Sequence, residues 1–373
     1  RTGTGKRTIG AGEHSGKGGV GMRVEKIGDA TLYLGDCLES LKTMPDKSIQ
    51  MCVTSPPYYG LRDYGVDGQI GLEKTPNEYI AKLVEIFREV KRVLKDDGIL
   101  WVNIGDSYAG SGGAGGDYNN GGLKDGQPKW KSKLDIKASN LKPKNLIGIP
   151  WMLAFALRSD GWYLRQDIIW AKPNPMPESV KDRCTKSHEY IFLLSKSAHY
   201  YYDADAIAEP STTYENRPAG VVRDRLYGYD SKQNKIRVKL GSKSFSKGQA
   251  NGAGIEPTGN AKKDYYEVPF VRNRRDVWTI STKHYKGSHF AVFPPEIPRL
   301  CILAGSKPGD TILDPFAGSG TTGAVAISLR RRAVLCELNV EYVGLIRERI
   351  TNEEAFYQPT LNDEECNSAK ETK

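Results

Sequence analysis

A serine, two prolines and a tyrosine follow directly on the apolar run at residues 49–54, and they are the first side chains here that could do chemistry. The two prolines remove two backbone donors and make the turn rigid. The Ser55 hydroxyl and the Pro56 carbonyl can then project as fixed hydrogen-bond acceptors, and Tyr58 offers an aromatic face beside them. This set suits a planar group that carries an exocyclic amine. The alternative is a rigid strand-to-loop turn with no chemical role.

A second motif lies at residues 311–323, where an apolar run is followed by Asp-Pro-Phe and a glycine-rich turn. Gly318 and Gly320 allow a backbone to approach a ligand closely, and the helix that should follow offers free N–H groups. The spacing matches a dinucleotide fingerprint, which is weak evidence alone. The motif lacks the lysine of a P-loop, which disfavours nucleoside triphosphate hydrolysis. Asp314 and Glu337, each at the end of an expected strand, can face a cationic amino-acid moiety and a ribose diol.

Alternating strand and helix patterns should position both motifs. Apolar residues at helical spacing alternate with short buried runs on both sides of a different central segment. This alternation predicts an α/β fold with a doubly wound, mostly parallel sheet. We expect strands at 31–34, 49–54, 99–104, 163–170, 188–195, 311–313 and 333–336, and helices at 78–94, 150–158, 295–304, 321–331 and 340–350.

The positive charge of the chain is concentrated in the central segment. The whole chain has a formal net charge of +9, and residues 212–286 hold sixteen Lys and Arg against seven Asp and Glu, a surplus of nine. Tyrosines, Phe245 and Trp278 are interleaved with these charges. A basic segment with aromatic residues suits a polyanion with stackable bases, whereas the alternative is a solvated insertion. Residues 105–126, with nine glycines, predict a mobile loop.

Several classes of protein are disfavoured by composition. No window approaches 18 uninterrupted apolar residues, which disfavours a transmembrane helix. The six cysteines form no C-x-x-C pair, so we expect neither a zinc ribbon nor a disulfide framework, and a reducing, intracellular compartment is the natural interpretation. The five histidines show no H-x-x-x-H spacing, and we expect no metal.

Together the two motifs resemble those of the S-adenosylmethionine-dependent DNA amino-methyltransferases. The order, with the Pro-Pro motif first, the glycine motif second and a basic segment between them, resembles the β group of that family. Further matching segments are Leu34-Gly-Asp36-Cys37, Asp167-Ile-Ile-Trp-Ala-Lys172, His188-Glu-Tyr190 and His289-Phe-Ala-Val-Phe-Pro-Pro295. The resemblance covers roughly residues 24–351 and implies a sheet of the class I methyltransferase type with an inserted target-recognition region.

The resemblance also implies roles for individual residues. The catalytic set is Ser55, Pro56, Pro57 and Tyr58. The set that binds S-adenosylmethionine is Asp36, Thr54, Ser55, His289, Phe293, Pro294, Asp314, Pro315, Phe316, Gly318, Gly320, Thr321, Glu337 and Leu338. The DNA-contacting set is Arg62, Arg272, Arg274 and Arg275.

The expected reaction is direct methyl transfer to the N4 amine of a cytosine flipped out of DNA, because serine before Pro-Pro-Tyr is commoner in N4 enzymes of the family and aspartate in adenine-N6 enzymes. Adenine N6 is the nearest alternative. Cytosine C5 chemistry is disfavoured, since no Pro-Cys occurs. A dinucleotide-dependent oxidoreductase and a catalytically silent nucleic-acid-binding module are more remote alternatives.

We expect a flexible basic leader at 1–21, a catalytic half at 22–205, the target-recognition region at 206–286, a cofactor-binding half at 287–351 and a disordered tail at 352–373. DNA is the expected partner, with no membrane. A restriction endonuclease partner and a homodimer both stay open.

Overall fold

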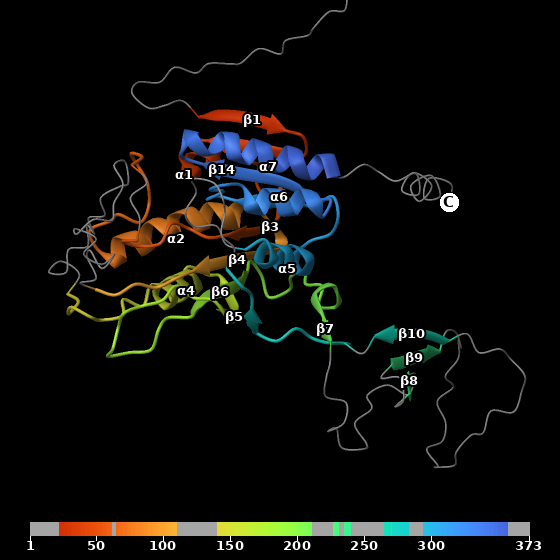
Figure 1. Ribbon diagram of the computed structural model, residues 1–373. Coiled ribbons are helices and arrows are strands. Elements are labelled where there is room, and N and C mark those ends of the chain that lie inside the picture. Colours follow the sequence, from red (N-terminus) through yellow and green to blue (C-terminus); the bar gives the residue numbers. More distant parts are fainter. Residues whose placement is uncertain are drawn as a thin grey trace, which may run out of the picture. The chain divides into compact units, whose positions relative to one another are not determined.

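The protein is described by a computed structural model that covers residues 22–61, 65–109, 140–210, 227–230, 235–239, 265–269, 271–282 and 294–356 (Figure 1). These residues divide into two compact units. The insert unit spans Ala204–Arg274, and the sheet unit contains the described residues on either side of it.

The sheet unit is built on nine strands in the order β1-β2-β14-β13-β3-β4-β6-β5-β12. The five central strands, from β2 to β4, are all parallel, and β12 is parallel to β5. Three neighbouring pairs are antiparallel: β1 with β2, β4 with β6, and β6 with β5. The strands are β1 (Arg23–Ile27), β2 (Ala30–Leu34), β3 (Ile49–Thr54), β4 (Leu94–Ile104), β5 (Tyr163–Ala171), β6 (His188–Ser195), β12 (Val277–Thr279), β13 (Thr311–Asp314) and β14 (Arg332–Glu337).

The helices that the structure describes cover this sheet in two groups. α1 (Cys37–Lys42) packs on α2 (Pro76–Val93), which packs on α4 (Ile149–Ser159). α5 (Glu296–Gly305), α6 (Thr321–Ser328) and α7 (Val343–Phe356) form the other group, and Figure 1 shows α6 and α7 running side by side. Helices on both faces confirm the doubly wound α/β fold.

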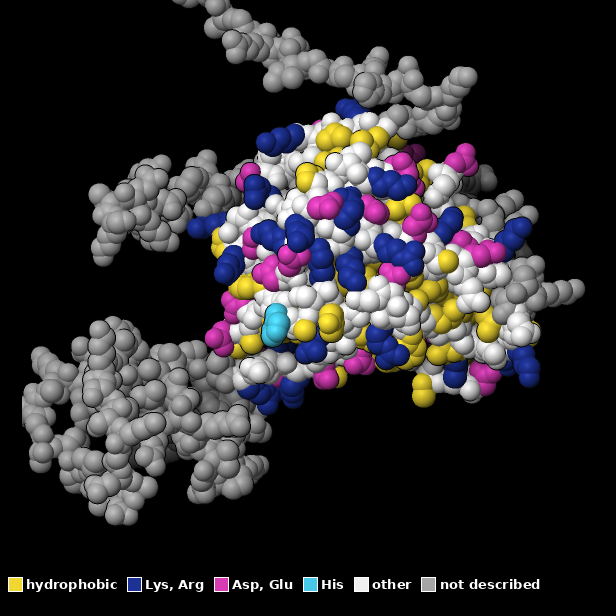
Figure 2. Space-filling view, turned by 180° about the vertical axis from the view of Figure 1, so that it is seen from behind, with side chains coloured by type: hydrophobic (Ala, Val, Ile, Leu, Met, Phe, Trp, Pro, Cys, Tyr) yellow, Lys and Arg dark blue, Asp and Glu magenta, His cyan; other side chains and the backbone are white. Residues whose placement is uncertain are grey.

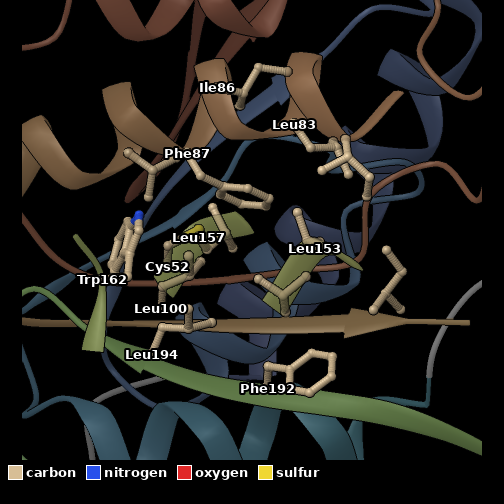
Figure 3. Close-up of a cluster of buried hydrophobic side chains, with 14 of the residues drawn as sticks. Cys52, Leu83, Ile86, Phe87, Leu100, Leu153, Leu157, Trp162, Phe192 and Leu194 are labelled. Carbon is tan, nitrogen blue, oxygen red and sulfur yellow. The ribbon is translucent and has the colours of Figure 1, made fainter. Parts of the chain in front are cut away.

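Local sequence explains the sharp start of α2. Thr75 accepts a hydrogen bond from the backbone N–H of Glu78, and the Glu78 side chain accepts from the Thr75 N–H, which makes a capping box. Its apolar face then packs with α4 over the sheet. Figure 3 shows Leu83 and Phe87 of α2 together with Leu153 of α4, above the strands.

The insert unit has its own small β-structure. β8 (Tyr227–Asp230), β9 (Lys235–Lys239) and β10 (Tyr265–Pro269) form an antiparallel sheet in the order β10-β9-β8. A second pair joins β7 (Glu209–Pro210) to β11 (Val271–Arg272), and a short 3-10 helix, η2, spans Asp205–Ile207. These elements lie within the segment where the sequence analysis places target recognition.

The structure corrects several of the expected elements. The strand expected at 99–104 begins five residues earlier, at Leu94, directly after α2. β1 has no predicted counterpart. The helix at 321–331 ends at Ser328 (α6), and the helix expected to end at 350 continues to Phe356. The end of the basic segment also differs, because β12 pairs with β5 in the large sheet although it lies within 206–286. The leader at 1–21, most of the glycine-rich loop and the tail after 356 lie outside the described residues.

Charge is distributed evenly over the sheet unit, at least on the side that Figure 2 shows. Basic and acidic side chains are interspersed on that face. None of the helices that the structure describes is long and apolar enough to cross a membrane.

Candidate active site

Both motifs end up at one edge of the sheet. β2, β14, β13 and β3 are parallel neighbours, so the residues that follow their last positions gather there. The Pro-Pro turn (residues 55–58) follows β3, and the glycine turn (residues 314–321) follows β13. Ligands bind at this carboxyl edge in open α/β sheets, where the strand order reverses.

A single hydrogen bond joins the two motifs. The Thr54 hydroxyl donates to Oδ1 of Asp314 at 2.6 Å. The same oxygen accepts from the Phe316 N–H at 3.0 Å, and Oδ2 accepts from the Thr322 hydroxyl at 2.6 Å. Asp314 is only 1% exposed, and burial raises its pKa although the three donors oppose that shift. This geometry favours a role for Asp314 in positioning the turn over direct contact with a cationic ligand.

Glu337, at the end of β14, is the second carboxylate of this edge. One of its oxygens accepts from the Gly318 N–H at 2.7 Å, and the other accepts from the Asn339 N–H at 2.8 Å. Burial raises the pKa of Glu337 to about 7, against the effect of these donors. Each carboxylate oxygen has two lone pairs, so Glu337 can still accept hydrogen bonds from the hydroxyls of a diol.

The glycine turn depends on backbone conformations that other residues avoid. Gly318 and Gly320 have φ values of +53° and +79°. A Cβ on Gly320 would also lie 3.2–3.3 Å from atoms of Ile346 in α7. Gly320 therefore serves packing between the turn and α7, in addition to any approach of a ligand.

α2 and the segment after the turn anchor the Pro-Pro turn. The Tyr79 hydroxyl donates to the Pro57 carbonyl at 2.7 Å, and the Gly60 N–H donates to the Gly71 carbonyl at 2.8 Å. Pro56 is buried and Ser55 is half-buried. The turn is thus a rigid platform on which the Ser55 hydroxyl remains partly accessible.

A polar network joins Ser55 and Tyr58 of this turn to residues that lie outside both motifs. The Tyr58 hydroxyl donates to Oε2 of Glu189 at 2.5 Å, and Oε1 of Glu189 forms an ion pair with Lys172. Oδ1 of Asn103 lies 3.4 Å from the Ser55 hydroxyl and 3.2 Å from the Tyr58 hydroxyl. Burial, followed by the Glu189 charge, raises the pKa of Tyr58 well above its ordinary value, so the phenol keeps its proton.

Asn103, Lys172 and Glu189 are functional candidates that sequence reasoning does not assign. The segments of Lys172 and Glu189 resemble family segments, but no role attaches to them there. Asn103 is 2% exposed and lies in the otherwise apolar run at residues 99–104 of β4, and a buried amide in such a run is a signal that could have singled it out.

The remaining expected cofactor residues are placed as follows. Asp36 is exposed and caps α1 by accepting from the Glu39 N–H at 3.0 Å. Phe316 within the glycine turn and Leu338 directly after β14 are half-buried, and Pro294 is buried just before α5. His289 and Phe293 lie outside the described residues, as does Arg62.

These residues fit S-adenosylmethionine. Glu337 is a buried carboxylate with free lone pairs, Asp36 is an exposed carboxylate, and the glycine turn allows a ligand to approach its backbone closely. The part of the chain that the structure describes holds no group of three or more His, Cys, Asp or Glu suited to a metal ion.

The arginines proposed for DNA contact are partly engaged within the insert unit. Arg272 forms an ion pair with Glu209 at 2.9 Å, and Nε of Arg274 donates to the Ile207 carbonyl at 2.8 Å. Arg275 is exposed. Trp278 requires a correction: it is 4% exposed and lies 6.1 Å from the Trp101 ring, so it belongs to the core and cannot stack on a base.

Comparison with known proteins shows the family. The N6_N4_Mtase family, described as DNA methylase, matches residues 49–348. The chain therefore belongs to the DNA methylase family of N6 and N4 amino-methyltransferases.

Curated relatives agree over most of the chain. The Type II methyltransferase M.SmaI of Serratia marcescens is 47% identical over 321 residues, which cover 86% of this chain and 90% of the relative. The Type II methyltransferase M.Cfr9I of Citrobacter freundii is 45% identical and covers 88% and 90% of the two chains.

One solved structure supports the fold. The PvuII DNA methyltransferase, titled cytosine-N4-specific, is similar with a TM-score of 0.52 at 19% identity, and the match covers 87% of this chain and 90% of that one. This likeness supports a sheet of the class I methyltransferase type, which the family resemblance implies.

Proposed function

We propose that this DNA methyltransferase transfers a methyl group from S-adenosylmethionine to the N4 amine of cytosine, and that it flips the target base out of the duplex. The observation that carries the proposal is the Pro-Pro turn itself. Ser55 is half-buried in this rigid turn, and the hydroxyl of the preceding Thr54 donates a hydrogen bond to Asp314 of the glycine turn.

The choice of cytosine N4 rests on Ser55. In the family that this chain resembles, serine at that position is commoner in cytosine-N4 enzymes, and the PvuII structure that shares the fold is titled cytosine-N4-specific. Adenine N6 is the alternative, because a serine hydroxyl can accept from either exocyclic amine.

S-adenosylmethionine is the cofactor that the proposal requires, and one neighbouring structure of this fold is titled as complexed with it. Glu337 would hold the ribose hydroxyls, and Asp36 would accept from the adenine amine. When bound, the cofactor supplies an electrophilic methyl group on a sulfonium. The glycine turn, positioned by Asp314, would shape the pocket around it.

The Pro-Pro turn would prepare the amine. The exocyclic nitrogen of cytosine is conjugated with its ring and is a poor nucleophile. Hydrogen bonds from its N–H groups to the Ser55 hydroxyl and the Pro56 carbonyl would favour a pyramidal, more nucleophilic geometry. The amine nitrogen would gain the methyl carbon as the bond of that carbon to sulfur breaks, and the nitrogen would release one proton to water. Holding the amine in line with the methyl group would supply most of the rate gain. Tyr58 would stack on the flipped base and offset part of the few kcal/mol that unstacking costs.

DNA recognition would fall to the insert unit. It holds most of the excess positive charge, and inserted loops commonly supply specificity on a rigid scaffold. The Type II names of the relatives support a role in a restriction–modification pair, with an endonuclease of the same recognition site as partner.

Mass spectrometry of nucleosides tests the proposal directly. DNA incubated with the enzyme and S-adenosylmethionine should yield N4-methylcytosine. N6-methyladenine would support the alternative instead. A preparation that binds the cofactor and DNA but yields no methylated nucleoside would contradict both.

A further inference from the structure

The polar network behind the Pro-Pro turn centres on Glu189. β6 is antiparallel to β4, so the first residues of β6, and not its last, lie at the carboxyl edge of β4. β5 is antiparallel to β6 in turn, and its end therefore brings Lys172 to the same edge. Three strands thus deliver Asn103, Lys172 and Glu189 to one place beside Tyr58.

The Glu189 carboxylate makes contacts on both of its oxygens. Oε2 accepts from the Tyr58 hydroxyl at 2.5 Å and from Nδ2 of Asn103 at 3.4 Å, while Oε1 pairs with the Lys172 ammonium. The Glu189 and Lys172 side chains are only 13% and 18% exposed. This ion pair is shielded from water and touches the catalytic turn directly.

These contacts determine which way the Asn103 amide points. Its Nδ2 donates to the Tyr190 carbonyl at 3.1 Å and also faces Glu189, so its Oδ1 must face the two hydroxyls of the turn. A hydroxyl has one proton, and if the Ser55 proton goes to Asn103, the lone pairs of Ser55 remain for a substrate amine.

The ring of Tyr58 is held in the same way. A Cβ on Gly105 would lie 2.6 Å from Cε2 of Tyr58, so the ring packs directly against that backbone. Its hydroxyl end is anchored by Glu189. Packing along the ring and a bond at its tip leave one orientation for the aromatic face.

We propose that Glu189, paired with Lys172, is a positioning residue for methyl transfer. It fixes the Tyr58 ring through its hydroxyl, and it fixes the Asn103 amide so that the Ser55 hydroxyl presents its lone pairs. This inference rests on the proposed role of the Pro-Pro turn.

Stability alone does not account for this arrangement. Buried ion pairs contribute little net stability, because desolvation offsets their attraction. A purely structural pair would also have no need to share its carboxylate with the turn. The pair of Asp160 with Arg88 of α2 serves for comparison: the Asp160 side chain is likewise 13% exposed, and the Arg88 side chain is 63% exposed.

A mutant cycle separates positioning from stability. The rate of a single methyl transfer, with DNA and cofactor saturating, is measured for the wild type, Glu189→Gln, Tyr58→Phe and the double variant. Ser55→Ala is included as the test of the turn, and Asp160→Asn as the matched control. Melting temperature and cofactor affinity are measured for every variant.

We expect Glu189→Gln to slow transfer roughly 10- to 100-fold, the effect of losing charge-assisted hydrogen bonds, with cofactor affinity unchanged. In the Tyr58→Phe background the same change should cost at least threefold less, because the phenol through which Glu189 acts is gone. Asp160→Asn should lower the melting temperature without slowing transfer.

Two failures are distinguishable. If Ser55→Ala transfers at the wild-type rate, the role of the Pro-Pro turn is wrong. If Ser55→Ala is slow but Glu189→Gln costs the same factor in the wild type as in the Tyr58→Phe variant, Glu189 does not act through the phenol and the inference is overturned. Should Glu189→Gln fail to fold, Glu189→Asp is measured in the same cycle. Its shorter side chain keeps the negative charge but moves it away from the Tyr58 hydroxyl.

Discussion

The glycine turn and the Pro-Pro turn follow neighbouring strands of the sheet, yet different backbone conformations and different side-chain contacts make them rigid. The glycine turn uses left-handed backbone and carboxylates whose partners are backbone N–H groups and hydroxyls. The Pro-Pro turn uses restricted backbone and a side-chain network that ends in an ion pair. The first should respond to changes of backbone and of pH, and the second to the loss of single hydroxyl groups.

The largest effect is expected at the glycine turn. Gly320→Leu should abolish cofactor binding and lower the melting temperature, because a side chain there needs a strained φ and overlaps Ile346. Calorimetric titration with S-adenosylmethionine measures the loss. Gly344→Ala is the control, since a Cβ at Gly344 meets nothing within 4 Å. If the Gly320 variant binds normally, the cofactor lies elsewhere.

Ser55→Ala should separate the two turns. It removes one hydroxyl and leaves the glycine turn intact, so methyl transfer should fall roughly 100-fold, by analogy with the loss of one preorganised hydrogen-bonding group. Cofactor affinity should stay within a factor of about two. Rapid-quench methylation assays and titration give both numbers, and a parallel loss of both would show that the turns are not independent.

A smaller effect is expected from pH at Glu337. The pKa of about 7 means that the ionised form, which can accept from a ribose diol, declines as pH falls from 8 to 6. Cofactor affinity should therefore fall with it. Glu337→Gln should bind more weakly by roughly 1.5–3 kcal/mol and lose this pH dependence. Affinity that follows pH equally in both proteins would assign the titration to another group.

The same raised pKa affects stability in the opposite direction. Between the ordinary value near 4.5 and about 7, the native chain binds a proton that the unfolded chain has released. The contribution of Glu337 to the free energy of unfolding is therefore full below that window and is lost as pH rises through it. Binding improves with rising pH while this contribution declines.

The smallest effect is expected from three arginines around the sequence boundary of the insert unit, of which Arg275 is the first residue after it. Replacing Arg272, Arg274 and Arg275 with alanine should weaken DNA binding and flatten its dependence on log salt by up to about 0.9 for each phosphate that is no longer neutralised. S-adenosylmethionine binding should not change. Glu209→Gln, which removes the partner of Arg272 but keeps all three cations, should retain the salt slope. Wild-type slope and affinity in the triple variant would place DNA recognition elsewhere.

Local signals suffice for much of the fold. Pro56 and Pro57 follow closely on the run at 49–54, and β3 begins and ends at the predicted residues. Thr75 and Glu78 mark the start of α2, two residues before the predicted helix. β1 lies at the edge of the sheet with mostly exposed residues, so it lacks the apolar signal on which strand prediction depends.

In the candidate site too, residues with a local sequence signal are predicted and residues that depend on long-range strand pairing are not. Residues 55–58 and 314–321 follow their strands directly, and a motif therefore identifies them. Glu189 reaches the site only because β6 runs antiparallel to β4, and strand direction cannot be read from a single strand. Trp278 shows the converse error, since a charged neighbourhood in sequence concealed a core residue.

The bond between Thr54 and Asp314 joins residues 260 positions apart. β13 and β14 lie in the middle of the sheet, between β2 and β3, yet they follow its other seven strands in the sequence. Until β13 and β14 have been synthesised, β2 and β3 therefore each lack one of their neighbours in the sheet. Closing so long a loop costs only about 2 kcal/mol more than closing one of about 20 residues, but contacts this distant in sequence form slowly. We therefore expect the edge that carries the two turns to assemble late in folding, and the earlier stages, with these strand edges exposed, to be prone to aggregation.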